Sequence, residues 1–129
     1  QYYQKVLQGS PDFVPALNNL AWIYYIDKDP KALVHARRAY QLNAKSADII
    51  DTYAMINLQQ GNTIEAIQLL EKAVKLSPRQ LQIRMHLAEA YIVNKDKKKA
   101  VFILHGILNE NEFLPEKNTV RKLLESIEN

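Results

Sequence analysis

Apolar residues in the middle of the chain recur at the spacing of α-helices. From residue 49 to residue 58 they fall at helical intervals, and Gly61 follows as a natural stop. A second series begins after Asn62, which can cap a helix, and ends before Pro78, because the residue that precedes a proline avoids the α conformation. The pattern therefore predicts two consecutive helices. Their apolar positions are Ile49, Ile50, Tyr53, Ala54, Ile56 and Leu58 in the first helix and Ile64, Ala66, Ile67, Leu70, Ala73, Val74 and Leu76 in the second.

Small side chains recur along the chain at a regular interval. In the second helix of each predicted pair, two series of positions repeat at one constant spacing, and in the first helix a large residue followed by alanine returns at nearly the same spacing. A period of about 34 residues is typical of stacked helix pairs, each of which needs its neighbour to cover its apolar face. The recurring residues are Ala32, Ala66 and Ala100, then Ala39, Ala73 and Ile107, and in the first helices Leu20-Ala21, Tyr53-Ala54 and Leu87-Ala88.

The spacing of these residues resembles the tetratricopeptide repeat. The first helix of that repeat carries a large residue, then a small one, then an aromatic residue one helical turn after the first, and its second helix carries two alanines two turns apart before a terminal proline. The resemblance covers nearly the whole chain and implies an all-α fold, a right-handed α-solenoid of helix-turn-helix repeats. Asn57, Ala44 and Ile107 depart from the pattern, since they replace an aromatic residue, a proline and a small residue. The matching positions are Leu20, Ala21 and Tyr24, Tyr53 and Ala54, Leu87, Ala88 and Tyr91, Ala32 and Ala39, Ala66 and Ala73, Ala100, Pro11 and Pro78.

The resemblance also implies how the chain is divided. We expect a single repeat domain over residues 1–129 that is a fragment of a longer repeat protein, because Gln1 already lies inside an amphipathic pattern. The last segment is expected to be a helix that covers the final apolar interface. The predicted parts are the end of a preceding repeat at 1–13, repeats at 14–46, 47–80 and 81–114, and a capping helix at 115–129.

The recurring alanines are expected where the two helices of each hairpin cross. A side chain larger than a methyl group at Ala21, Ala54 or Ala66 would push the helices apart, at a cost of about 1–3 kcal/mol through overpacking. These positions are therefore the main sequence determinants of the predicted fold.

Few residues in the chain carry the chemistry of an enzyme. The sequence has no cysteine and lacks the motifs of zinc proteases, serine hydrolases and phosphate-binding loops. His86 and Glu89 have a spacing that can present both to a metal, but they form an incomplete site, and a solvated polar pair is the simpler interpretation. His35 and His105 have no evident partner and are expected on the surface. We predict no enzyme, no catalytic residue, no metal site and no cofactor.

Charge and hydropathy indicate which partners to expect but leave the cellular compartment open. The 17 basic and 14 acidic residues give a net charge of +3, and positive charge is concentrated only between Lys95 and Ala100. No apolar run approaches the roughly 20 residues needed to cross a bilayer, and no signal-peptide pattern is present. We therefore expect no nucleic acid partner and no membrane contact from this fragment, whereas the lack of cysteine fits either the cytoplasm or the periplasm.

The resemblance implies that the first helices line a concave groove. Trp22, Tyr25, Met55 and Met85 would give the groove an aromatic and adaptable surface able to hold a peptide or helix, although core packing is an equally good interpretation for Trp22. The carboxylates of Asp48, Asp51 and Glu89 would also lie on this groove, and they favour a protein partner that carries apolar anchors and basic residues. Chaperone-binding members of the family hold an acidic C-terminus with lysines and asparagines on the first helices. In this chain only Asn18 is of a matching residue type. The residues expected to bind the partner are Asn18, Trp22, Tyr25, Asp48, Asp51, Met55, Leu58, Met85, Glu89 and Ile92.

A non-catalytic protein-protein interaction scaffold is the leading functional prediction, and two alternatives remain open. The face that carries Lys95, Lys97, Lys98 and Lys99 can hold a polyanion such as an exopolysaccharide or nucleic acid, and its binding would weaken steeply with added salt. The first repeat can instead pair with a copy of itself to form a homodimer.

A narrower likeness bears on the location. The order of the segments NNLAW, ARRAY, QQGN and EAIQLLEKAVKLSP looks like the C-terminal part of the tetratricopeptide-repeat lipoproteins of the bacterial PEP-CTERM and exosortase system. That likeness implies a periplasmic protein, or one anchored to the membrane and facing the periplasm, with a role in exopolysaccharide or protein-sorting machinery. Without it, the cytoplasm is expected.

Overall fold

The structure is a computed structural model that describes residues 1–110 and 115–128. These residues form eight α-helices and no strand, which confirms the predicted all-α fold. The predicted boundary at residue 114 and the last residue, Asn129, lie outside the described residues. The helices are α1 (Tyr2–Gly9), α2 (Val14–Ile26), α3 (Lys31–Leu42), α4 (Ala47–Gln59), α5 (Thr63–Leu76), α6 (Leu81–Val93), α7 (Lys97–Glu110) and α8 (Lys117–Glu128).

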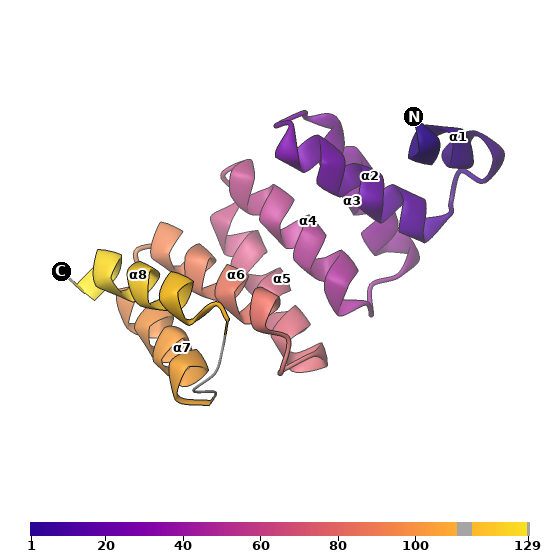
Figure 1. Ribbon diagram of the computed structural model, residues 1–129. Coiled ribbons are helices and arrows are strands. Elements are labelled where there is room, and N and C mark those ends of the chain that lie inside the picture. Colours follow the sequence, from indigo (N-terminus) through magenta and orange to yellow (C-terminus); the bar gives the residue numbers. More distant parts are fainter. Residues whose placement is uncertain (111–114, 129) are drawn as a thin grey trace.

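The helices are stacked in the order of the sequence, from the indigo N-terminal end to the yellow C-terminal end of Figure 1. Helix α2 packs on α3, α4 on α5 and α6 on α7, and the pairs are joined through α3 with α4 and α5 with α6. Contacts also link α2 to α4 and α4 to α6, so the first helices of successive pairs are neighbours. The described helices form an α-solenoid whose first helices make one continuous surface.

The recurring alanines lie inside this stack. All eight have no exposed surface, which confirms that the small side chains face neighbouring helices. A methyl group fills the space at these positions, so the helix pairs can approach closely. The eight residues are Ala21, Ala32, Ala39, Ala54, Ala66, Ala73, Ala88 and Ala100.

The turn inside each helix pair contains a residue with left-handed backbone. Lys28, Gly61 and Lys95 have φ values of 55°, 89° and 63°, and they occupy equivalent places in the three pairs. Glycine adopts this conformation freely, whereas the side chains of the two lysines make it strained. Each turn is closed by a backbone hydrogen bond of 2.8 Å. These bonds run from the N–H groups of Asp29, Asn62 and Asp96 to the carbonyl oxygens of Tyr24, Asn57 and Tyr91.

The middle pair holds a buried amide where the repeat pattern has an aromatic residue. The Nδ2 of Asn57 donates to the carbonyl oxygen of Tyr53 at 2.9 Å, and its Oδ1 accepts from Nδ2 of Asn62 at 3.1 Å. Asn62 is the N-cap residue of α5, as predicted, but its side chain bonds no N–H of that helix. The departure at Asn57 therefore ties the end of α4 to the start of α5.

The two ends of the stack are less deeply packed than its centre. Helix α1 contains no buried residue, and its Leu7 packs against the cluster that contains Leu17. Helix α8 places Val120 and Leu124 in a cluster with Leu104 of α7. The division of the chain into repeats and a capping helix at the residues given above stays a prediction.

Candidate functional site

A hollow of about 320 Å³ lies on the surface made by the first helices. Helix α2 contributes Trp22, α4 contributes Asp48 and Asp51, and α6 contributes His86. Four of the predicted binding residues, Asn18, Trp22, Asp48 and Asp51, therefore meet around one cavity, together with neighbours outside that prediction. The residues around the hollow are Asn18, Asn19, Trp22, Asp48, Asp51, Thr52, Gln80, Gln82 and His86.

Trp22 contributes an aromatic ring to the lining of the hollow. The rings of Trp22 and Tyr25 are stacked, with centroids 4.9 Å apart and an angle of 6° between the ring planes. Trp22 is 38% exposed, so core packing does not account for this side chain. The stack fixes the indole while leaving part of its surface open, and the face of an aromatic ring attracts cations.

His86 is buried and connects α6 to α4. Its Nδ1 lies 2.7 Å from Oδ1 of Asp51, and its Nε2 lies 3.1 Å from Nε2 of Gln82. Burial opposes the charged imidazole, but the hydrogen bond to Asp51 and the charges of Asp51 and Glu89 outweigh it, so the pKa of His86 is raised. The expectation that His86 and Glu89 form a solvated pair is wrong, because a carboxylate from the preceding helix pair holds the imidazole inside the protein.

The pKa values of Glu89 and Tyr25 are also shifted by burial and by neighbouring charges. Burial raises the pKa of the Glu89 carboxyl; nearby His86 counteracts this rise and Asp51 adds to it. The pKa of the Tyr25 hydroxyl is raised by burial and then by the charges of Glu89 and Asp51. Tyr25, Asp51, His86 and Glu89 therefore form one electrostatic group across α2, α4 and α6.

The polar residues of the hollow are rich in hydrogen-bond acceptors. Oδ1 of Asp48 accepts from Nε2 of Gln80 at 2.7 Å and joins the start of α6 to α4. Oδ1 of Asn18 is buried, and no hydrogen-bond donor in the described part of the chain reaches it. A ligand that brings hydrogen-bond donors and positive charge would complement these carboxylates.

Met55 and Met85 do not form the groove surface that the sequence analysis expected. Met55 is 4% exposed because α4 has α2 on one side and α6 on the other. Met85 is 6% exposed because it packs in the cluster that contains Val120 of α8. Leu58 and Ile92 are half-buried and also pack against core residues.

The other two histidines have partners that the sequence did not reveal. Nδ1 of His35 lies 2.9 Å from the carbonyl oxygen of Lys31, and its ring centroid lies 5.2 Å from that of Tyr24. Nε2 of His105 lies 3.1 Å from Oε1 of Glu128. His105 lies on the surface as expected, whereas His35 is half-buried.

The arrangement of these groups is suited to recognition. Across residues 1–110 and 115–128, no three histidine, cysteine, aspartate or glutamate side chains come together in a way that could hold a metal ion. In the same part of the chain, no helix has both the length and the apolar character needed to cross a bilayer. The hollow combines an exposed aromatic ring, carboxylates and a buried histidine bonded to an aspartate, a combination that can bind a cationic or amphipathic ligand.

Comparison with known proteins identifies the repeat. Residues 57–116 match a family model described as Tetratricopeptide repeat. The match covers a little less than half of the chain, and the helix pairs stacked on either side of it are similar to the same repeat. No curated protein matches the chain at a significant level.

Solved structures share the fold at low sequence identity. PilF of Pseudomonas aeruginosa is 22% identical, with a TM-score of 0.81 over 97% of this chain and 56% of that one. YrrB, a TPR protein with an unusual peptide-binding site, is 17% identical, with a TM-score of 0.73 over 87% of this chain and 58% of that one. The TPR2B domain of yeast Sti1, solved in complex with pHsp70, is 17% identical, with a TM-score of 0.79 over 89% of this chain and 95% of the domain.

The chain corresponds to only part of two of these relatives. The chain spans 56% of the length of PilF and 58% of that of YrrB, and at these identities the likeness establishes the fold alone. The narrower likeness to lipoproteins of the PEP-CTERM system stays a prediction.

Proposed function

We propose that this chain is a non-catalytic protein-interaction scaffold whose hollow on α2, α4 and α6 binds a segment of a partner protein. The observation that carries the proposal is the exposed Trp22 indole, held by Tyr25 beside the carboxylates of Asp48 and Asp51. The fold supports the class of function, because the Sti1 domain was solved in complex with pHsp70 and YrrB is described as having a peptide-binding site.

The chemistry of the hollow favours a basic segment with an apolar anchor. A cation within about 6 Å of the indole centroid is attracted by the ring, and a guanidinium can donate to a carboxylate at the same time. The volume of about 320 Å³ lies at the lower end of ligand pockets. It suits one or two side chains of a longer segment that continues along the first helices. Asp48 and Glu89 would repel an acidic segment.

Selection from a phage-displayed library of random peptides tests the proposal. We expect the enriched peptides to carry arginine or lysine close to an aromatic or aliphatic residue. Trp22→Ala and Asp48→Lys should each weaken their binding about tenfold or more, as measured by fluorescence anisotropy. Val34→Ala is the matched control, because it removes an apolar side chain that is exposed on α3. Enriched peptides that are acidic, or that bind the Trp22→Ala variant as well as the wild type, would refute the assignment.

Polyanion binding and self-association, the two alternative functions, would give different experimental results. A polyanion held by Lys95, Lys97, Lys98 and Lys99 would be released steeply by added salt, whereas anchoring on the indole responds weakly. Self-association would appear in sedimentation of the wild type alone and would compete with peptide for the hollow. A peptide that binds a monomer and tolerates salt supports the scaffold assignment.

A further inference from the structure

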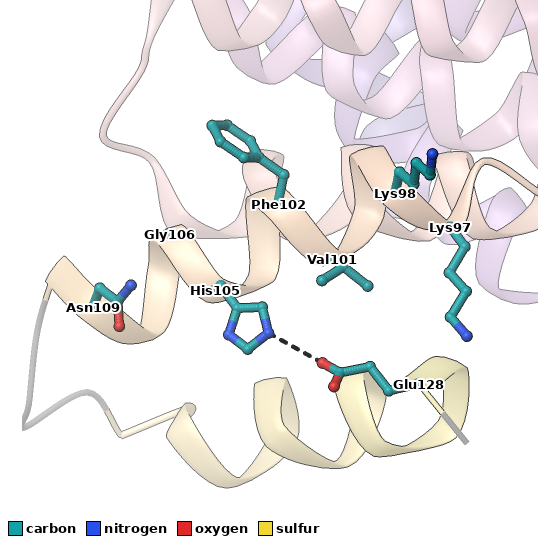
Figure 2. Close-up of a pocket in the computed structure, with 8 residues that line it drawn as sticks. All are labelled: Lys97, Lys98, Val101, Phe102, His105, Gly106, Asn109 and Glu128. Atoms are coloured by element: carbon teal, nitrogen blue, oxygen red, sulfur yellow. Dashed lines mark hydrogen bonds and ion pairs between the residues drawn. The ribbon is translucent and has the colours of Figure 1, made fainter.

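A second hollow lies along the outer face of α7 and shares no lining residue with the first. Its volume is about 840 Å³, and it extends from Lys97 at the start of the helix to Asn109 near its end. At about 1.5 Å per residue this is roughly 18 Å, or about three helical turns. Figure 2 shows Val101 and His105 directed towards α8, where His105 meets Glu128, while Phe102 and Lys98 lie on the side of α7 away from α8.

The central feature of this face is an uncovered phenyl ring. Phe102 is 81% exposed, and none of the ring contacts found in the described part of the chain includes it. Val101 and Gly106 lie within the same hollow, so the open surface around Phe102 is apolar. An apolar ring that stays in water forgoes the stabilisation that burial would supply, and exposed rings of this kind commonly mark interaction sites.

Positive charge is concentrated at one end of the hollow. Helix α7 begins with Lys97, Lys98 and Lys99, and no acidic residue lies in its first turn. The N-terminus of a helix carries a partial positive charge, so the three lysines in this turn interact unfavourably with it. Nζ of Lys99 lies 3.7 Å from Oδ2 of Asp96, but Lys97 and Lys98 form no ion pair within the described residues. Carboxylates from another molecule would relieve this local conflict.

We propose that this face of α7 is a second docking site, which binds an acidic amphipathic helix of a partner protein. An aliphatic or aromatic residue of that helix packs beside Phe102 and Val101, and its aspartates or glutamates meet Lys97 and Lys98. The length of the hollow matches a helical segment of three turns, and its charge is complementary to an acidic one. The proposal does not depend on the function assigned to the groove of α2, α4 and α6.

Other occupants fit the same face less well. A lipid surface is flat, whereas this face is hollowed along its length. A nucleic acid presents a regular series of phosphates, whereas the hollow offers only Lys97 and Lys98 and also contains the carboxylate of Glu128. The acidic helix is therefore the occupant that satisfies both the apolar centre and the charged end.

The test uses the Trp22→Ala variant as the immobilised target, so that the groove proposed above contributes little to selection. A phage-displayed library of random peptides of about 16 residues covers the length of the hollow. We expect the enriched peptides to be acidic and to carry a regularly spaced apolar residue. Their affinity, measured by fluorescence anisotropy, should fall about tenfold or more for Phe102→Ala and for the double substitution K97E/K98E. It should be unchanged by Val34→Ala, which removes another exposed apolar side chain.

Each contrary result overturns the proposal in a recognisable way. Enriched peptides that are basic, or that bind Phe102→Ala unchanged, place the binding elsewhere. Binding of phosphatidylserine vesicles or single-stranded DNA that requires Phe102, without peptides that require it, assigns the face to a lipid or nucleic acid. Sedimentation showing that the wild type dimerises and Phe102→Ala does not assigns it to a second copy of the chain. Circular dichroism should show the same helix content in every variant, because the substituted side chains are exposed.

Discussion

Substitution of Ala54 by leucine tests the close approach of the helices. Ala54 lies in α4, at the centre of the stack, and has no exposed surface. Helix α4 packs against α5, α3, α2 and α6, so a longer side chain at its buried face meets neighbours on several sides. Leucine adds three carbon atoms where the structure holds a methyl group, and the helices must separate or the side chain must leave its preferred rotamer.

The size of the effect follows from overpacking and from the length of the chain. Inserting methylene groups into a well-packed core costs about 1–3 kcal/mol. At about 2.1 cal/mol/K per residue, the unfolding entropy of a chain of 129 residues is close to 0.27 kcal/mol/K. The melting temperature of Ala54→Leu should therefore fall by about 4–11 °C relative to the wild type.

Thermal melts followed by circular dichroism, with urea titrations in parallel, measure this difference. Gln68→Leu is the matched control, because it introduces the same side chain at an exposed position of α5, the partner helix of α4. The control should melt within about 2 °C of the wild type. If Ala54→Leu and Gln68→Leu melt together, the helices do not depend on a small residue at this crossing and the packing argument fails.

Three further substitutions test other parts of the structure. The raised pKa of His86 means that its protonation stabilises the fold, fully below the unfolded pKa near 6.5 and less as pH rises through the folded pKa. The urea midpoint should therefore fall as pH rises over that range. Asp51→Asn should make this fall smaller. Lys95→Gly should raise stability by up to about 1 kcal/mol in the same titration, because glycine relieves the positive φ; a loss of stability would argue against strain there. Asn57→Ala should lower stability by about 1–3 kcal/mol by removing one buried and one partly buried hydrogen bond, and an unchanged urea midpoint would contradict that role.

The fold could be predicted from the sequence because its determinants are local and repeated. Alanines that return at one constant spacing, as Ala32, Ala66 and Ala100 do, mark the same helix crossing in each pair, and all of them are buried in the structure. The turn at Gly61 was also visible, since glycine favours left-handed backbone. The equivalent turns at Lys28 and Lys95 carry no such signal, because a lysine does not reveal that its φ is positive.

The candidate sites were less predictable because they depend on neighbours distant in sequence. Trp22 stays partly exposed on α2, whereas Met55 and Met85 are covered by adjacent helices. His86 shows no sign in its own helix of the carboxylate that holds it, since Asp51 belongs to the preceding pair. The hollow beside Phe102 also includes Glu128 of α8, which is distant in sequence from the residues of α7.

Unequal burial along the stack has a consequence for how tightly each helix is held. Helix α4 contains eight buried residues, whereas α1 contains none. Amide protons exchange by local opening, so those of α1 should exchange with deuterium far sooner than those of α4, and protection should rise from the ends towards the middle. A segment seated across α2, α4 and α6 would tie the loosely held N-terminal side to the firm centre. Its binding would therefore slow exchange in helices that it never touches.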